Sequence, residues 1–243
     1  SSGQETITTY TVYDSKNRVV EEIDPYGYSV KYEYNEIGKQ SAVIDQLGNR
    51  TEYKYDNLGN LKCIVYPDGT TESYTYDAEG RMLTSTNCAG RTTKYVYDKL
   101  GRVIKTIYPD GTFTETEYDT AGRVKKIIDE RGNVTEYEYD KAGRNTKIID
   151  ALGNITVFEY DKNGRQVKMT DAMGNTTEYE YDGYGRKTKI IFADGTFISM
   201  AYDSMGNKIS ETDQAGKTTR FEYDPSGRLV KVIDALGNET VYG

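Results

Sequence analysis

The chain has 243 residues, a formal net charge of −8, and 24 tyrosines alongside 24 glycines. Its mean hydropathy of −0.76 is too polar for a conventional thick core, whereas its aromatic and β-branched content is too high for a disordered chain. No basic block is present to attract nucleic acid, and no apolar run approaches the ~20 residues of a membrane-spanning helix.

A single pattern repeats along the chain: a tyrosine followed by an aspartate recurs every 21 residues, from Tyr13-Asp14 to Tyr223-Asp224. Tyr34-Asn35 fills the one gap, so eleven copies keep the same spacing without an insertion. A fixed period of this length indicates a repeat architecture, in which each unit buries a thin strip of side chains against its neighbours.

Within each period the predicted elements follow in the same order, as the copy beginning at Thr135 illustrates. Residues 135–139 alternate in period two, which is typical of a half-buried strand, and residues 147–149 form the return strand. Residues 140–143 and 150–153 both have the pattern aspartate-x-x-glycine, which is typical of a type I turn with positive φ at the glycine. Turns every ten or eleven residues leave no room for helices, so the sequence predicts an antiparallel meander.

The turns vary in sequence but keep the same chemistry. Two second turns contain Pro-Asp-Gly, at residues 67–69 and 109–111, where proline presets φ at the second position of the turn. In the first copy Asn17 stands where glycine is expected, and asparagine tolerates the left-handed conformation better than most residues.

The turn positions also predict the register of each hairpin. If residues 140–143 hold the turn, Tyr139 lies opposite Thr146, Glu138 opposite Lys147, and Tyr137 opposite Ile148. One face of the sheet then carries tyrosine and isoleucine, and the other carries glutamate facing lysine. Cross-strand pairs of both kinds stabilise a sheet by about 0.2–1 kcal/mol each.

The predicted fold is therefore all-β, an antiparallel meander of 21-residue β-hairpins in one long sheet. An open twisted sheet of about 22 strands rarely stays flat, so we expect it to coil into a partial shell or superhelix with the Tyr/Ile face concave. We interpret residues 1–243 as a single array cut from a longer repeat region, with residues 1–3 as a cloning remnant. Open strand edges at both ends would permit end-to-end self-association.

The motif Tyr-Asp-x-x-Gly-Arg, at residues 97–102, 139–144 and 223–228, resembles the RHS/YD-repeat family over nearly the whole chain. The sequence departs from the family pattern at a few positions. Asn35 replaces the aspartate, and Lys39, Asn60 and Asn207 replace the arginine. Thr116 and Met200 stand two residues before the tyrosine, where the family usually has an aromatic residue. The resemblance, which extends to insecticidal toxin-complex shells and teneurins, implies repeats that spiral into a hollow shell. It also implies an extracellular or cell-surface location, and bacterial members can enclose a C-terminal toxin. The family's autoproteolytic core segment is not visible here, so the chain resembles shell wall alone.

The repeat pattern argues against an enzyme. The carboxylates recur identically in every copy, whereas an active site needs a unique constellation, and the absence of histidine excludes Ser-His-Asp and Cys-His arrangements. Each aspartate is accounted for by its own turn, so we expect no catalytic residue, no metal and no cofactor. Cys63 and Cys88 fall at different points of successive copies, and we expect no disulfide between them.

The leading interpretation is a structural scaffold, a wall segment of an RHS-type β-shell that encloses or displays a toxin or other polypeptide cargo. The alternative is a module that binds cell-surface carbohydrate, because aromatic rings stack on sugar faces. The candidate stacking residues precede the Tyr-Asp positions by two: Tyr53, Tyr74, Tyr95, Tyr137 and Tyr179. The competing interpretation is that these rings pack on each other and on the isoleucines. The arginines that follow the first glycines are expected to lock the turns: Arg102, Arg123, Arg144 and Arg165.

Overall fold

The computed structural model describes residues 9–243, and all the secondary-structure elements assigned in this range are β-strands. The contacts divide the chain into two compact units, one containing residues up to 116 with 128–132, and the other residues 117–127 with 133–243. Residues 1–3, interpreted as a cloning remnant, lie outside the described range.

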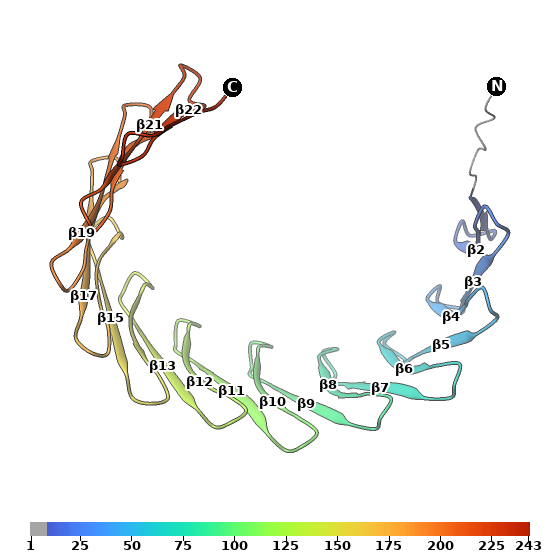
Figure 1. Ribbon diagram of the computed structural model, residues 1–243. Helices are drawn as coiled ribbons and strands as arrows, with labels where there is room; N and C mark the ends of the chain where they lie inside the picture. Colours follow the sequence, from blue (N-terminus) through green and yellow to red (C-terminus); the bar gives the residue numbers. More distant parts are fainter. Residues whose placement is uncertain (1–8) are drawn as a thin grey trace, which may run out of the picture. The chain divides into compact units, whose positions relative to one another are not determined.

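The first unit is an antiparallel meander in which each strand pairs with the strands next to it in the sequence (Figure 1). Its strands are β1 (Tyr10–Tyr13), β2 (Val19–Ile23), β3 (Ser29–Tyr34), β4 (Gln40–Ile44), β5 (Arg50–Tyr55), β6 (Leu61–Val65), β7 (Thr71–Tyr76), β8 (Met82–Thr86), β9 (Thr92–Tyr97), β10 (Val103–Ile107) and the first part of β11 (Phe113–Tyr118).

The second unit repeats the same meander (Figure 1). Its strands are β12 (Val124–Ile128), nearly complete, β13 (Val134–Tyr139), β14 (Asn145–Ile149), β15 (Ile155–Tyr160), β16 (Gln166–Thr170), β17 (Thr176–Tyr181), β18 (Lys187–Ile191), β19 (Phe197–Tyr202), β20 (Lys208–Thr212), β21 (Thr218–Tyr223), β22 (Leu229–Ile233) and β23 (Glu239–Val241). The predicted all-β antiparallel meander is confirmed, whereas the coiling of the sheet and the single array over residues 1–243 stay predictions.

The turns have the predicted hydrogen bonds. In the turn after β13, the Gly143 N–H donates to the Asp140 carbonyl at 3.1 Å, and the Asp140 N–H donates to the Arg144 carbonyl at 3.0 Å. The Asp140 carboxylate accepts from the backbone N–H groups of Ala142 and Arg144 at 2.9 and 3.0 Å. The closing glycines have positive φ, and Asn17, at φ 60°, adopts the same conformation in the first copy.

The register is confirmed at two of the three predicted pairs. Tyr137 lies opposite Ile148, and Glu138 lies opposite Lys147, whose Nζ is 2.9 Å from Glu138 Oε1. The predicted pairing of Tyr139 with Thr146 is wrong, because Tyr139 lies opposite Asn145. The register shifts at a β-bulge between Glu138 and Tyr139. Closing the turn through Asp140 and Arg144 leaves one more residue on the return strand than on the first strand, and the bulge accommodates it.

Very little of the sheet is fully buried. Among the described residues, Ala42 is the only apolar side chain in the buried class, and none of the larger side chains is fully buried. Most strand side chains are half-buried instead, as in β14, where all five residues are. The fold therefore depends on contacts between neighbouring hairpins and on backbone pairing, because it has no thick core.

We predict that Gly153→Ala destabilises the turn after β14 by about 1–2 kcal/mol, because an L-residue strains at positive φ. Gly153 has φ 81°, and a Cβ built there meets nothing within 4 Å, so the cost comes from the backbone alone. Hydrogen exchange measures the loss over residues 145–160, and for the control below over residues 176–191. Gly183→Ala is the control, because Gly183 lacks positive φ and also has open space. Equal effects of the two substitutions would contradict this account.

Candidate functional site

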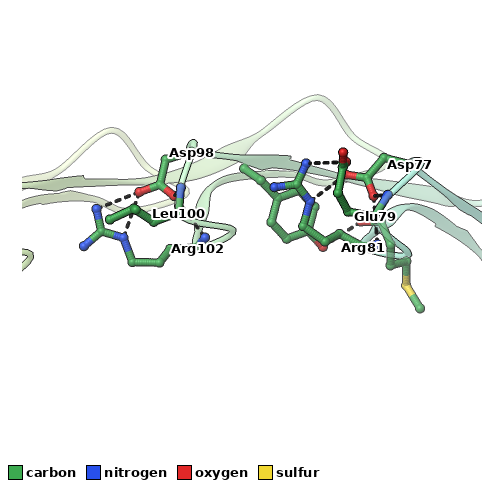
Figure 2. Close-up of polar contacts among 8 residues, drawn as sticks. Asp77, Glu79, Arg81, Asp98, Leu100 and Arg102 are labelled. Atoms are coloured by element: carbon green, nitrogen blue, oxygen red, sulfur yellow. Dashed lines mark hydrogen bonds and ion pairs between the residues drawn. The ribbon is translucent and has the colours of Figure 1, made fainter.

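The first turn of each hairpin is locked by the residue that follows its glycine. The first turns are the five-residue segments that begin at the Tyr-Asp aspartate, such as residues 140–144. Arg144 donates from Nε to Asp140 Oδ2 at 2.6 Å, while Asp140 Oδ1 holds the turn backbone. Figure 2 shows the same geometry in two consecutive turns, with Arg81 on Asp77 and Arg102 on Asp98. The predicted role of these arginines as turn locks is confirmed.

The same arginine also reaches the next hairpin. The Arg144 guanidinium carbon lies 4.7 Å from the centre of the Tyr160 ring, and Arg144 Nη1 donates to the Asp161 carbonyl at 3.2 Å. A guanidinium over an aromatic face is attracted by the negative face of the ring. Each such arginine therefore joins an aspartate of its own turn to the tyrosine that ends the first strand of the next hairpin.

The tyrosine completes the connection through its hydroxyl group. Tyr160 donates to the Asn145 carbonyl at 2.7 Å. The pairing of β14 with β15 ends at Lys147 and Val157, two residues short of Asn145, so this carbonyl has no partner in that ladder. A buried carbonyl without a partner is costly, and the phenol of the next hairpin supplies the missing donor.

We call this row of contacts the Asp–Arg–Tyr ladder. Nine tyrosines donate to the carbonyl fifteen residues earlier: Tyr34, Tyr55, Tyr76, Tyr97, Tyr139, Tyr160, Tyr181, Tyr202 and Tyr223. Six arginines lie over the tyrosine ring sixteen residues later: Arg18, Arg81, Arg123, Arg144, Arg165 and Arg186. The ladder therefore repeats within both units.

Three departures from the sequence motif change the ladder locally. Lys39 replaces arginine and lies 5.3 Å from the Tyr55 ring centre. Asn60 and Asn207 keep the turn lock, because each side-chain amide donates to its own aspartate, but the charge over the next ring is lost. The hydroxyl bonds of Tyr76 and Tyr223 persist there.

The electrostatic effects follow from these contacts. The hydrogen bond from the Arg144 backbone N–H, followed by that from its side chain, lowers the pKa of Asp140 below its usual value. Burial raises the pKa of the Tyr55 and Tyr181 phenols. Both directions keep the groups in the protonation state that the ladder uses, with carboxylates ionised and phenols neutral.

The tyrosines predicted to stack on sugars lie on strands, half-buried, and the partner opposite each one is usually an apolar or small residue. Their opposite residues are Ile64, Ser85, Thr106, Ile148 and Ile190 for Tyr53, Tyr74, Tyr95, Tyr137 and Tyr179, respectively. Tyr74 donates to Glu72 at 2.7 Å, and this hydrogen bond, with burial, raises the pKa of Tyr74 to about 12. Lys187 Nζ lies 4.2 Å from the Tyr179 ring centre. In each unit alternation brings these tyrosines to one face.

We also searched the described residues for metal-binding groups, cysteine pairs and membrane-spanning helices. In the part of the chain that the structure describes, no group of three or more His, Cys, Asp or Glu side chains is arranged to hold a metal ion. Cys63 and Cys88 are free cysteines, Cys63 half-buried in β6 and Cys88 exposed in a turn. No helix long and apolar enough to cross a membrane occurs among the described residues.

Sequence reasoning missed the contacts between hairpins. It assigned Arg144 to its own turn and did not connect it with Tyr160 or the Asn145 carbonyl. The available signal was the constant spacing from arginine to tyrosine, sixteen residues in every copy that has both.

Hairpins joined by identical contacts at a fixed period define a β-hairpin repeat scaffold of the shell type. Residues 2–149 match the teneurin YD-shell family, and residues 160–196 and 202–239 match the RHS repeat. The chain belongs to the teneurin YD-shell family, whose members are structural shell scaffolds.

Two solved structures share the fold. TcdB2-TccC3 without its hypervariable C-terminal region has a TM-score of 0.58 at 19% identity, over 94% of this chain and 14% of that chain. TcdB2-TccC3-TEV has a TM-score of 0.58 at 20% identity, over 96% of this chain and 15% of that chain. This chain thus spans 14–15% of the length of those chains. Among curated protein sequences none matches it.

We predict that Tyr160→Phe lowers the free energy of opening of β15 by about 0.5–1.5 kcal/mol, because the Asn145 carbonyl loses its donor. Hydrogen exchange of residues 145–160 measures the change. Tyr137→Phe is the matched control, since the Tyr137 hydroxyl makes no hydrogen bond to another described residue. A loss for Tyr137→Phe as large as that for Tyr160→Phe would contradict the role of the hydroxyl bond.

Replacing Asn60 with arginine should repair the ladder. We expect Asn60→Arg to stabilise the β6–β7 region by about 0.5–1 kcal/mol through the new charge over the Tyr76 ring. Asn154→Arg is the control, because Asn154 makes the same amide contact with Asp150 in a second turn, where residue 170, sixteen further on, is threonine. If both arginines stabilise their turns equally, the ring contact contributes nothing.

Acid should weaken the array. A carboxyl whose pKa is lowered on folding stabilises the fold above its unfolded pKa, here 3.8, and loses that contribution as the pH falls through the folded pKa. We therefore expect the urea midpoint to be level from pH 7 to about 5 and to fall below about pH 4. Asp119→Asn combined with Asp140→Asn should flatten the fall. A midpoint unchanged down to pH 3 would contradict the assignment.

Proposed function

We propose that this array is part of the wall of a β-shell that encloses or displays a polypeptide cargo, such as a toxin, outside the cell that makes it. The observation that carries the proposal is the Asp–Arg–Tyr ladder. Because Tyr160 bonds to the preceding hairpin and Arg144 stacks on the following one, each hairpin is completed by its neighbours. Such a chain extends as a continuous wall rather than closing into a globule.

Two further observations support the proposal. The chain belongs to the teneurin YD-shell family, and it shares its fold with TcdB2-TccC3. Several charged groups of the sheet are also used structurally, with Asp140 neutralised by Arg144 and Glu138 by Lys147. A scaffold needs such repeated, equivalent contacts, whereas catalysis needs one unique set of groups.

Protection of the cargo from a protease tests whether the array forms part of an enclosing wall. The full-length protein that carries this array would be digested briefly, and the survival of its enclosed segment followed by mass spectrometry. We expect protection in the unchanged protein and faster cleavage when Arg144→Ala and Arg165→Ala interrupt the ladder. Arg220→Ala, on a strand, is the control because Arg220 is not part of the ladder. Cargo cleaved at the same rate with and without an intact ladder would overturn the proposal.

The second candidate function is binding of cell-surface carbohydrate by the tyrosine stripe. It is supported by the hydroxyl groups of Tyr53, Tyr95, Tyr137 and Tyr179, which make no hydrogen bond to another described residue and are available to a ligand. Saturable binding on a glycan array that is lost in Tyr95→Ala with Tyr137→Ala would favour this function. Binding retained in that variant, or absent from the unchanged chain, would eliminate it.

A further inference from the structure

The two edges of the sheet carry different charge. In each unit the first turns lie along one edge, and the second turns lie along the other (Figure 1). The second turns are the five-residue segments such as residues 150–154. Over the whole sequence the second turns contain eleven carboxylates and three cations, a net charge of −8, whereas the first turns contain twelve carboxylates and thirteen cations, a net charge of +1. The second turns account for −4 in each unit, so within each unit the acidity is concentrated on the second-turn edge.

The difference arises from the residue that locks each turn. In the first turns Asp140 is paired with the Arg144 guanidinium, which cancels its charge. In the second turns the equivalent aspartates bond to neutral amides instead: Asp45, Asp150, Asp171 and Asp234 accept from Asn49, Asn154, Asn175 and Asn238. The second-turn edge thus keeps its negative charge, although its turn geometry is the same.

Both edges also expose large apolar side chains at the third position of the turn. On the second-turn edge Leu47, Leu152, Met173 and Leu236 are 84–87% exposed. On the first-turn edge Ile37, Leu58 and Leu100 are 66–77% exposed. A side chain this exposed buries little apolar area against its own hairpin and is accessible to another molecule.

The first-turn edge carries lysines that can pair with the carboxylates of the second-turn edge. Lys99, Lys141 and Lys162 are exposed at the second position of their turns and form no ion pair within the described part of the chain. One turn per hairpin sets a spacing of about 10 Å along either edge, twice the strand separation. Because the period is the same on both edges, apolar tips and opposite charges on two copies can be brought into register.

We propose that the first-turn edge of one copy of this chain docks laterally against the second-turn edge of another copy. The contact is made by side chains of the turns, because the turns already bond their backbone groups internally, as at Asp150 and Gly153. The lysines of one edge face the carboxylates of the other, and the apolar tips are covered between them. Two different edges meet, so the contact is head-to-tail and association continues beyond the dimer.

Sedimentation equilibrium of the unchanged chain over a range of concentrations tests the proposal at two ionic strengths. At about 0.1 M salt, where charges interact over about 10 Å, the mean mass should rise with concentration. At about 1 M salt the range falls to about 3 Å, and association should weaken at least about tenfold. Addition of strands at the two ends of the sheet, the other route to self-association, would be insensitive to turn charge.

Charge reversal identifies the edges. Lys99→Glu, Lys141→Glu and Lys162→Glu together should abolish association at low salt. Lys62→Glu, Lys94→Glu and Lys125→Glu make the same change in net charge at exposed strand positions, and should leave association nearly intact.

A second variant makes the other edge less acidic. Ala151→Lys, Ala172→Lys and Ala193→Lys place lysine at the turn position that Lys141 already occupies in a first turn, so the turns should fold. Three added lysines change the net charge of the second-turn edge from −8 to −5, so this variant alone should associate more weakly than the unchanged chain at low salt. Mixing it with the first-edge variant should give a dimer of the two variants, because the first-turn edge of one and the second-turn edge of the other are unchanged. A chain that is monomeric at every concentration in low salt overturns the proposal. So does association that survives the first-edge substitutions, or a mixture that stays monomeric.

Discussion

The carbonyl of Asn145 lies beyond the last residue pair between its strand and the next, and the Tyr160 hydroxyl of the following hairpin donates to it. That constraint originates in the first turn, where closure through Asp140 and Arg144 adds a residue to the return strand and forces a bulge. The arginine that locks the turn is then placed over the next tyrosine ring. One local geometry thereby produces both the hairpin and its attachment to the next one.

The energetics of the array follow from the same geometry. With Ala42 the only apolar residue in the buried class among those described, hydrophobic burial is spread thinly over half-buried strand side chains. Stability in such an array is approximately a sum of hairpin terms and nearest-neighbour terms, and the ladder contributes to the nearest-neighbour terms. Asn60 and Asn207, which keep the turn but place no charge over the next ring, mark places where one of these nearest-neighbour contacts is missing.

The sequence was sufficient for most contacts within one period, with an error at Tyr139. Alternation fixed the faces, so the Glu138–Lys147 and Tyr137–Ile148 pairs were predicted correctly. The error at Tyr139 arose because the bulge depends on which backbone groups close the turn, and an aspartate-x-x-glycine pattern does not specify the closing pair. The stacking of Arg144 on Tyr160 was missed because it joins two copies, and a pattern compared copy by copy shows only what each copy contains. The stripe of Tyr53, Tyr74, Tyr95, Tyr137 and Tyr179 was placed correctly on strands, but no contact in the structure assigns it a ligand.

The most direct test of the ladder is a double-mutant cycle between Arg144→Asn and Tyr160→Leu, read as the free energy of opening of residues 155–160 by hydrogen exchange. Asparagine is chosen because Asn60 and Asn207 show that it keeps the turn lock, so only the contact with the next hairpin is removed. If the ladder joins neighbouring hairpins, the two substitutions should be coupled by about 0.5–1 kcal/mol. Strictly additive effects would contradict the account, because the arginine and the tyrosine would then stabilise their hairpins independently.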